Sequence, residues 1–113
     1  MMGKSVLVIV AHPDLPVSRA NRQLAEAAAA VDGVTVHDIY LTYPDLFIDG
    51  NLERQRLATA DALVLQHPIY WYAWPGLLKE WIDRTLTAGW AYGRGGTALH
   101  GKSMMSSITT GSP

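Results

Sequence analysis

The sequence predicts an α/β fold, a doubly wound parallel sheet with four strands of an expected five. The first observation is the continuous apolar run Val6–Val10, which is typical of a strand buried on both faces of a parallel sheet. The second is that strand-like and helix-like patterns alternate along the 113 residues, which indicates right-handed βαβ crossovers. The third is the length, which suits one domain with a buried core.

The individual elements follow from local patterns. Short apolar runs predict strands, and apolar residues at helical spacing predict the helices between them. Gly33 lies where the first predicted helix stops. Strands are predicted at residues 5–10, 34–39, 62–66 and 102–109, and helices at 18–31, at 51–60 and after Pro75.

Composition narrows the class of protein. Hydrophobic residues make up 49% of the chain and charged residues 17%, which is typical of a globular protein and not of a disordered chain. The net charge is −1 and there is no basic run, so no nucleic-acid partner is expected. Cysteine is absent, which excludes disulfides and thiolate metal sites. With no signal-peptide pattern and no apolar segment of membrane-spanning length, we expect a cytoplasmic protein.

An aromatic segment follows the third predicted strand. The loop between Pro68 and Pro75 contains Tyr70, Trp71, Tyr72 and Trp74, and a helical pattern begins after it. A rigid loop at the carboxyl end of a strand lies where an open α/β sheet binds its ligands. Aromatic rings there suit a flat heteroaromatic ligand. The alternative is that these rings only cover one end of the core.

The segment after the first predicted strand is a candidate anion site. Ser18 suits the N-cap of the following helix, and the amides of the first helical turn attract an anion. His12 and Asn21 are further donors for a phosphate. The alternative is an ordinary capped helix with an ordinary loop histidine. Because the first and third strands form the switch point of a sheet with the order 2-1-3-4-5, the two candidate segments are expected to be neighbours.

Other patterns are set aside. Residues 96–103 match the phosphate-loop pattern G-x-x-x-x-G-K-[ST], but that mechanism needs a strand before the loop and a helix after it, whereas a strand follows here. The four histidines have no metal-ligand spacing, so no metal site is predicted. No arrangement of serine, histidine and acid indicates acyl transfer.

Residues 1–113 are expected to form a single domain that is incomplete at its C-terminus. A doubly wound sheet of this order normally has a fifth strand, and the sequence stops just after the fourth. The fourth strand would then be an apolar, unprotected edge, which favours association or strand exchange.

Four motifs together resemble a known family. They are AHPDLPVSRAN at residues 11–21, HPIYWYAWPGLLKEWIDR at 67–84, GWAYGRGGTALHGK at 89–102 and TTG at 109–111. In this order they resemble the flavodoxin-like NAD(P)H:quinone oxidoreductases, across essentially the whole chain. The most similar branch is the ancillary quinone reductase of the glutathione-regulated potassium-efflux system, related to the modulator-of-drug-activity proteins. Simple flavodoxins share the fold but lack the HPxxWY and LKEWIDR elements.

The resemblance implies a flavodoxin-like fold and a bound flavin, FMN with FAD as the alternative. The flavin phosphate would lie on the first loop and its ring against the aromatic loop, with the end of the fourth strand on the other side. The implied cofactor-binding residues are His12, Ser18, Arg19, Ala20, Asn21, Pro68, Ile69, Tyr70, Trp71, Tyr72, Thr109, Thr110, Gly111 and Ser112. Ser112 stands where a second glycine is common in the family. The tyrosine and histidine proposed as proton relays in the animal enzymes of the family would lie in the part that this chain lacks, so no catalytic acid or base is assigned.

The activity implied by the resemblance is that of an NAD(P)H:quinone oxidoreductase, in which hydride passes from nicotinamide to flavin and then to a quinone. The resemblance also implies a homodimer and, in the most similar branch, contact with a potassium-efflux membrane protein at the inner face of the cell membrane. Two alternatives stay open. One is a flavin-binding regulatory subunit of a glutathione-gated potassium-efflux antiporter, and the other is a flavodoxin-like electron carrier.

Overall fold

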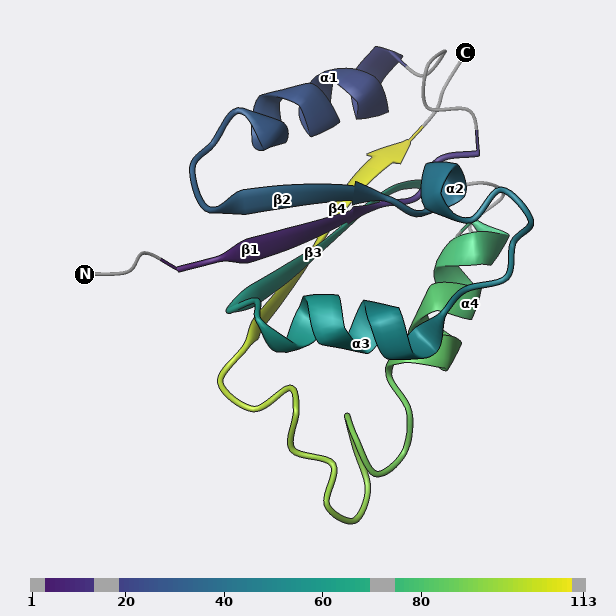
Figure 1. The fold of residues 1–113 in the computed structure, drawn as a ribbon. Coiled ribbons are helices and arrows are strands. Elements are labelled where there is room, and N and C mark those ends of the chain that lie inside the picture. The colour runs from purple at the N-terminus through teal and green to yellow at the C-terminus, as the bar shows by residue number, and fades with distance from the viewer. Residues whose placement is uncertain (1–3, 14–18, 70–74, 111–113) are drawn as a thin grey trace.

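A computed structural model describes residues 4–13, 19–69 and 75–110 of the chain. Within them, four strands form one parallel sheet in the order β2-β1-β3-β4 (Figure 1). The strands are β1 (Val6–Val10), β2 (Val34–Asp38), β3 (Ala62–Ile69) and β4 (Ser103–Thr110), and the helices are α1 (Arg19–Ala29), α2 (Ile39–Thr42), α3 (Gly50–Ala58) and α4 (Gly76–Thr85). The predicted doubly wound α/β sheet with four strands is confirmed.

The strand register brings the carboxyl ends of β1, β3 and β4 to one edge of the sheet. Val10, the last residue of β1, lies opposite Asp38 of β2 and Gln66 of β3. β3 and β4 continue to pair beyond that point, as far as Ile69 opposite Thr110. β3 and β4 therefore extend past the end of β1, and a ligand site at this edge would be bordered by their ends.

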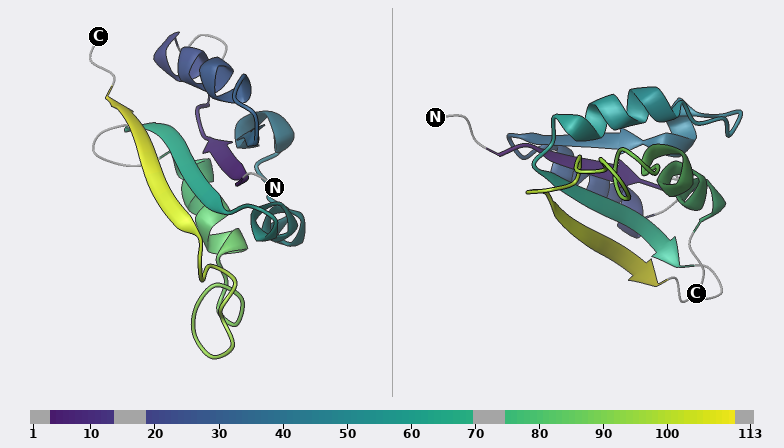
Figure 2. Two further views of the ribbon diagram at one scale, coloured as in Figure 1. Left: turned by 90° about the vertical axis from the view of Figure 1, so that its left-hand side faces the viewer. Right: turned by 90° about the horizontal axis from the view of Figure 1, so that it is seen from below.

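The helices divide between the two faces of the sheet (Figure 2). On one face, Ile9 and Leu63 of the sheet belong to the larger core cluster together with Leu57 of α3 and Trp81 of α4. On the other face, Ala25 of α1 packs in a smaller cluster with valine side chains of β1. Because full burial of one large apolar side chain contributes about 1.5–3 kcal/mol, the larger cluster provides most of the apolar stabilisation.

β4 is an edge of the described sheet, and its apolar side chains are poorly covered. Met104, Met105 and Ile108 are 52%, 62% and 47% exposed. An apolar groove lies between α1 and the β3–β4 pair, and its lining includes Leu24 of α1 and Met105 of β4. Among the described residues, apolar packing thus leaves a gap between α1 and β4.

β3 is longer than predicted. It continues through His67 and Pro68 to Ile69, whereas the apolar pattern predicts an end at Gln66. Because β1 ends opposite Gln66, the last part of β3 has a strand neighbour on one side alone. A proline, which lacks an N–H group, is tolerated in such an edge-like segment.

α2 is not predicted by the sequence. Its residues IYLT favour a strand by propensity, and the pattern places a strand and then a loop here. The side chain of Asp38 accepts a hydrogen bond from the backbone N–H of Leu41 at 3.1 Å, and this N-cap starts the helix. Ile39 is fully buried in the larger core cluster, so tertiary packing supports the helical turn.

α3 packs closely against the end of α4. Its N-cap is Asp49, whose side chain accepts from the backbone N–H of Leu52 at 3.1 Å. A Cβ at Gly50 would overlap the backbone carbonyl of Arg84, so a glycine is required at this contact. Nη1 of Arg54 donates to the same carbonyl at 2.7 Å. α3 and α4 are therefore joined by a close backbone approach and a hydrogen bond.

Candidate functional site

Three of the predicted binding segments meet at the carboxyl edge of the sheet. β1 leads into His12, and the crossover returns through α1, which begins at Arg19. β3 ends at Ile69 and β4 at Thr110, and these two residues are register partners. In a doubly wound sheet, this edge is the position of the ligand.

The structure describes part of the predicted cofactor-binding set. His12 and Thr109 are half-buried, Arg19 and Ala20 are exposed, and Asn21 and Pro68 are buried. Ile69 and Thr110 are the last residues of β3 and β4. The rest of the predicted set lies outside the described residues: Ser18, Tyr70, Trp71, Tyr72, Gly111 and Ser112.

A buried amide network joins three elements at this edge. Asn21, in the first turn of α1, is 3% exposed, and its Nδ2 donates to Oγ1 of Thr109 on β4 at 2.9 Å. Gln66 of β3 is also 3% exposed, and its Nε2 donates to the backbone carbonyl of Asn21 at 2.8 Å. The backbone carbonyl of Gln66 accepts from the N–H of Ala11 at 2.9 Å. α1, β3 and β4 are thereby linked by neutral hydrogen bonds.

Gln66 is not among the predicted site residues, because the sequence pattern marks it only as the end of an apolar strand. A signal was present, because a single amide closes the apolar run 62–66. A polar side chain in a strand covered on both faces requires a hydrogen-bond partner. The first turn of the neighbouring helix, where Asn21 stands, is the place where that partner is found.

The first turn of α1 suits an anion. It contains no acidic residue, and Arg19 is exposed there. The N–H groups of a first turn have no intrahelical partner, and the helix dipole places about half a positive elementary charge at this end. A phosphate at this position would meet neutral or positive groups of the helix.

Both flanks of the predicted aromatic loop are held by hydrogen bonds. On the β3 side, His67 is fully buried, and its Nδ1 donates to the backbone carbonyl of Pro68 at 2.9 Å. On the α4 side, the backbone N–H of Leu77 donates to the hydroxyl oxygen of Tyr40 in α2 at 3.2 Å. The residues on either side of the predicted loop are therefore held by the pairing of β3 with β4 and by a hydrogen bond to α2.

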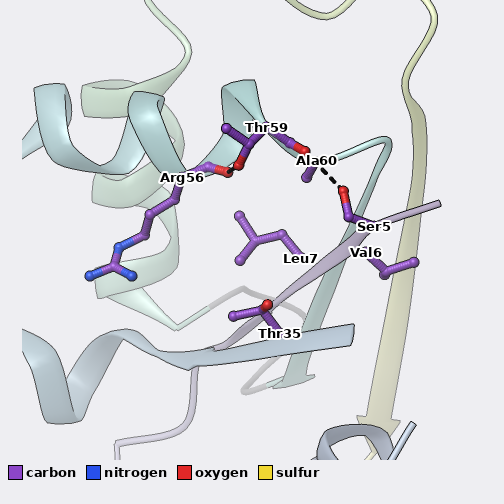
Figure 3. A pocket seen from close by; sticks show the side chains of 7 residues that line it. All are labelled: Ser5, Val6, Leu7, Thr35, Arg56, Thr59 and Ala60. Atoms are coloured by element: carbon purple, nitrogen blue, oxygen red, sulfur yellow. Dashed lines mark hydrogen bonds between the residues drawn. The ribbon is translucent and has the colours of Figure 1, made fainter. Parts of the chain in front are cut away.

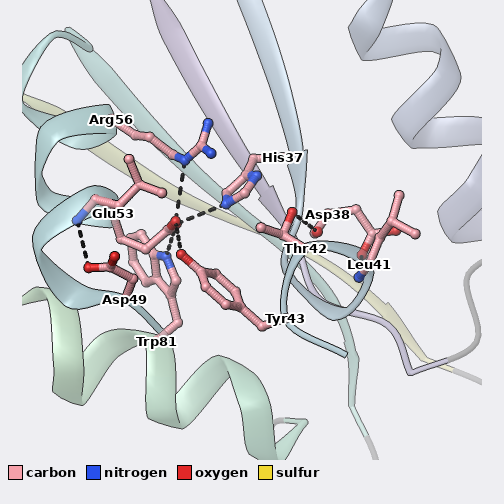
Figure 4. A network of polar contacts seen from close by, with 10 residues as sticks. His37, Asp38, Leu41, Thr42, Tyr43, Asp49, Glu53, Arg56 and Trp81 are labelled. Carbon is pink, nitrogen blue, oxygen red and sulfur yellow. Dashed lines mark hydrogen bonds and ion pairs between the residues drawn. The ribbon is translucent and has the colours of Figure 1, made fainter. Parts of the chain in front are cut away.

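A second polar cluster surrounds Glu53 of α3 beneath the opposite face of the sheet (Figure 4). The carboxylate is fully buried and accepts from Tyr43 at 2.6 Å and from Nε1 of Trp81 at 2.8 Å. It also accepts from Nε2 of His37 at 2.9 Å and from Nε of Arg56 at 3.2 Å. Residues of β2, α3 and α4 and the segment after α2 are held together by this one carboxylate.

The hydrogen bonds around Glu53 outweigh the effect of its burial on the pKa. Burial alone raises the pKa of this carboxyl, but the bonds from His37, Tyr43 and Trp81 lower the pKa from 4.5 to about 2. Burial and the hydrogen bond to Glu53 raise the pKa of Tyr43 well above its ordinary value. Glu53 is therefore ionised and Tyr43 is protonated at neutral pH, which suits a structural cluster.

A pocket lined by Ser5, Val6, Leu7, Thr35, Arg56, Thr59 and Ala60 lies at the other edge of the sheet (Figure 3). Its volume of about 250 Å³ is below the range of about 300–1,000 Å³ that is usual for small-molecule sites. It lies at the start of β1, away from the carboxyl ends where doubly wound sheets bind ligands. We do not assign a function to it.

Within residues 4–13, 19–69 and 75–110, no group of three or more histidine, aspartate or glutamate side chains is arranged to hold a metal ion. No helix in the same part of the chain has the length and apolar character needed to cross a membrane.

Residues 4–113 match the model of a protein family described by its flavodoxin-like fold. The match covers nearly the whole chain, so it includes every segment of the candidate site. It also agrees with the sheet order β2-β1-β3-β4 that the structure shows.

Three solved structures are similar in sequence and in fold. A thermophilic tryptophan halogenase from Streptomycin violaceusniger is 43% identical, with a TM-score of 0.90 over 95% of this chain and 62% of that one. General stress protein 14 from Treponema denticola, in complex with FMN, is 41% identical, with a TM-score of 0.91 over 96% of this chain and 63% of that one. An NADPH-quinone reductase from P. pentosaceus is 32% identical, with a TM-score of 0.84 over 96% of this chain and 61% of that one. This chain thus spans less than two thirds of the length of each of these proteins.

Proposed function

Because this chain belongs to the flavodoxin-like fold family, we propose that it binds FMN at the carboxyl edge of its sheet and is a flavin-dependent NAD(P)H:quinone oxidoreductase. The observation that carries the proposal is the FMN complex of the Treponema denticola protein, which is 41% identical with a TM-score of 0.91. The NADPH-quinone reductase from P. pentosaceus supports NAD(P)H and a quinone as the substrate pair. FAD is the alternative cofactor.

The described residues fit the flavin phosphate. The first turn of α1 offers backbone N–H groups and the exposed Arg19, and it has no carboxylate that would repel a phosphate. His12 on the preceding loop and Asn21 are the proposed side-chain neighbours of that phosphate. Ser18, Arg19 and Ala20 supply the helix start in this proposal.

The flavin ring is assigned to the ends of β3 and β4. Pro68 is buried and Ile69 lies opposite Thr110, so the backbone of both strand ends borders the same edge. The roles of Tyr70, Trp71, Tyr72, Gly111 and Ser112 beside the ring stay predictions. When bound, the flavin accepts hydride from nicotinamide and delivers it to a quinone, while the protein binds and orients it.

Retention of flavin is the direct test of this proposal. The purified chain is mixed with FMN or with FAD and desalted, and the visible absorbance of the protein fraction is measured. We expect FMN to be retained and NAD(P)H oxidation to follow when a benzoquinone is added, with parallel lines in double-reciprocal plots. A protein fraction without either flavin would contradict the proposal.

The finer assignment is the branch of quinone reductases ancillary to glutathione-regulated potassium efflux, and it rests on the sequence motifs. The alternative functions are a regulatory subunit of a potassium-efflux antiporter and a single-electron carrier. Quinone reduction by the purified chain, with no membrane protein present, separates the enzyme from the regulatory subunit. Direct oxidation of NADH or NADPH separates the enzyme from the electron carrier.

Tryptophan halogenation is a second candidate because the 43% identical structure carries that name. The test supplies tryptophan, bromide, reduced FMN and oxygen, and it analyses the products by mass spectrometry. Brominated tryptophan would favour the halogenase activity. Quinone turnover without brominated product would favour the reductase.

Assembly and location are further parts of the proposal. We propose a homodimer and a cytoplasmic protein that contacts the inner face of the cell membrane through its partner, both from the family resemblance. Light scattering tests the dimer, and membrane flotation with and without the potassium-efflux protein tests the contact.

A further inference from the structure

We propose that Gln66 and Thr109 are positioning residues that hold the start of α1 against the ends of β3 and β4. In doing so they set the position of the phosphate half of the flavin site relative to the ring half. This inference rests on the proposed function, because it concerns the same site. It assigns Thr109 a role through Asn21, in addition to the flavin contact implied by the family resemblance.

Gln66 forms hydrogen bonds at both ends of the candidate phosphate-binding segment, at Ala11 and at Asn21. Its backbone carbonyl accepts from the N–H of Ala11, where the loop begins, at 2.9 Å. Its side-chain Nε2 donates to the carbonyl of Asn21, where the loop has become helix, at 2.8 Å. One residue of β3 therefore holds both Ala11 and Asn21 by hydrogen bonds. Since Gln66 is 3% exposed, water does not compete effectively for these bonds.

Thr109 extends the restraint to β4. Its Oγ1 accepts from Nδ2 of Asn21 at 2.9 Å, and it lies opposite Pro68 in the strand register. The hydrogen bond thus connects the first turn of α1 to the point where the ends of β3 and β4 border the proposed ring site. Like other hydrogen bonds, this one is directional. Because both partners are uncharged, salt does not screen it.

Apolar packing does not substitute for the hydrogen bond between α1 and β4. The groove between α1 and the β3–β4 pair is lined by Leu24, Val64 and Met105, and Met105 is 62% exposed. Among the described residues, no apolar side chains fill the space between α1 and β4. The smaller core cluster packs α1 on β1 and on Val64 of β3, so what the polar network adds is a link from α1 to β4, through Asn21 and Thr109.

The test compares three probes of the site. Riboflavin reports on the ring half, inorganic phosphate on the phosphate half, and FMN on both halves in the correct relative position. The variants are Thr109→Val and Gln66→Met, which remove one hydrogen bond each with little change in volume. Thr109→Ser keeps the hydroxyl, and Ser107→Ala is a matched control, because Ser107 lies on the same strand and is half-buried.

We expect Thr109→Val and Gln66→Met to raise the dissociation constant for FMN about tenfold, which is the effect of one buried hydrogen bond lost. Phosphate should bind both variants within about twofold of wild type, and riboflavin should bind Gln66→Met within about twofold, because Gln66 makes no flavin contact in the proposal. Thr109→Ser should restore FMN binding, and Ser107→Ala should leave it unchanged. This pattern distinguishes positioning from a general loss of stability, which would weaken all three probes together.

Unchanged FMN affinity in both variants, or an equal loss for all three probes, would overturn the inference. If Gln66→Met does not fold, Gln66→Leu replaces it, because it also lacks the donor to the Asn21 carbonyl and adds no charge. A wild-type chain that binds no flavin would overturn the proposed function and this inference with it. A wild-type chain that binds FMN normally while the variants do so equally well would overturn the inference alone.

Discussion

The Glu53 cluster centres on a buried carboxylate and the Gln66–Asn21–Thr109 network on two buried amides, and the two differ in charge and in position. Glu53 is an ionised carboxylate with four donors, beneath the face of the sheet that α2, α3 and α4 cover. The second network consists of amides and a hydroxyl at the carboxyl edge, between α1 and the ends of β3 and β4. The first joins elements of the scaffold, and the second joins elements of the proposed site.

The difference has a physical consequence. A buried carboxylate held by hydrogen bonds makes stability depend on pH and leaves several unsatisfied donors when it is removed. A network of uncharged groups has no titrating member, so its contribution is the same at every ordinary pH. In this proposal, the pH-dependent part of the stability and the geometry of the site depend on separate groups of residues.

Glu53→Ala should destabilise the fold by about 3–5 kcal/mol, because it leaves buried donors of Tyr43 and Trp81 without their acceptor. Urea denaturation at pH 7 measures the change. Glu80→Ala is the matched control, since Glu80 is 51% exposed and paired with Arg84 at 3.3 Å, and its loss should cost less than about 1 kcal/mol. Equal effects of the two substitutions would contradict the structural role of Glu53.

Acid should remove a large part of the same stabilisation. The pKa of Glu53 is lowered in the folded state from 4.5 to about 2, so the unfolded chain takes up the proton first as the pH falls. The contribution of roughly 3 kcal/mol is complete above about pH 4.5 and is lost progressively towards about pH 2. Urea denaturation at pH 7, 4.5 and 3 measures this decrease in the free energy of unfolding.

Glu53→Gln isolates this contribution from that of the other carboxylates. The amide does not titrate, so the variant should be less stable than wild type at pH 7 and should lose less stability on acidification. The two proteins should therefore approach each other as the pH falls. A constant difference between them at all three pH values would show that the pKa of Glu53 is not lowered.

In the Gln66–Asn21–Thr109 network, Asn21→Asp should weaken FMN binding by about 1–3 kcal/mol. The carboxylate adds negative charge beside the proposed phosphate and cannot donate to Thr109. Titration of flavin fluorescence measures the affinity. Gln23→Glu adds the same charge at an exposed position of α1 and should have a much smaller effect. If Asn21→Asp binds FMN as tightly as wild type, the assignment of Asn21 to the phosphate region is wrong.

The parts of the fold that the sequence predicted correctly are those that depend on the local pattern of apolar and polar residues. The buried run Val6–Val10 and the alternation of elements were sufficient for the sheet, because burial on both faces leaves a continuous apolar signature. α2 was missed, since its helical turn depends on the Asp38 cap and on burial of Ile39 more than on the propensity of IYLT. Tertiary context overrode propensity there.

The buried polar clusters could not be predicted in the same way. Glu53 stands in a helix of mostly polar residues, and its donors His37, Tyr43 and Trp81 lie 16, 10 and 28 positions away. Asn21 and Thr109 are 88 positions apart. The sequence placed Asn21 and Thr109 in one site through the family resemblance, but only the register and the crossover of α1 bring them within hydrogen-bond distance.

Thr109→Val should cost about 1 kcal/mol of stability, the smallest effect of the series, because one neutral hydrogen bond is lost at a half-buried position. The cost should be the same at pH 7 and at pH 3, since neither the Asn21 amide nor the Thr109 hydroxyl titrates. Thr109→Ser, measured by the same urea denaturation, should be close to wild type. The loss of stability in Glu53→Gln is expected to become smaller as the pH falls. If the loss in Thr109→Val also became smaller, a titrating group would take part at the carboxyl edge, and the two networks would not be independent.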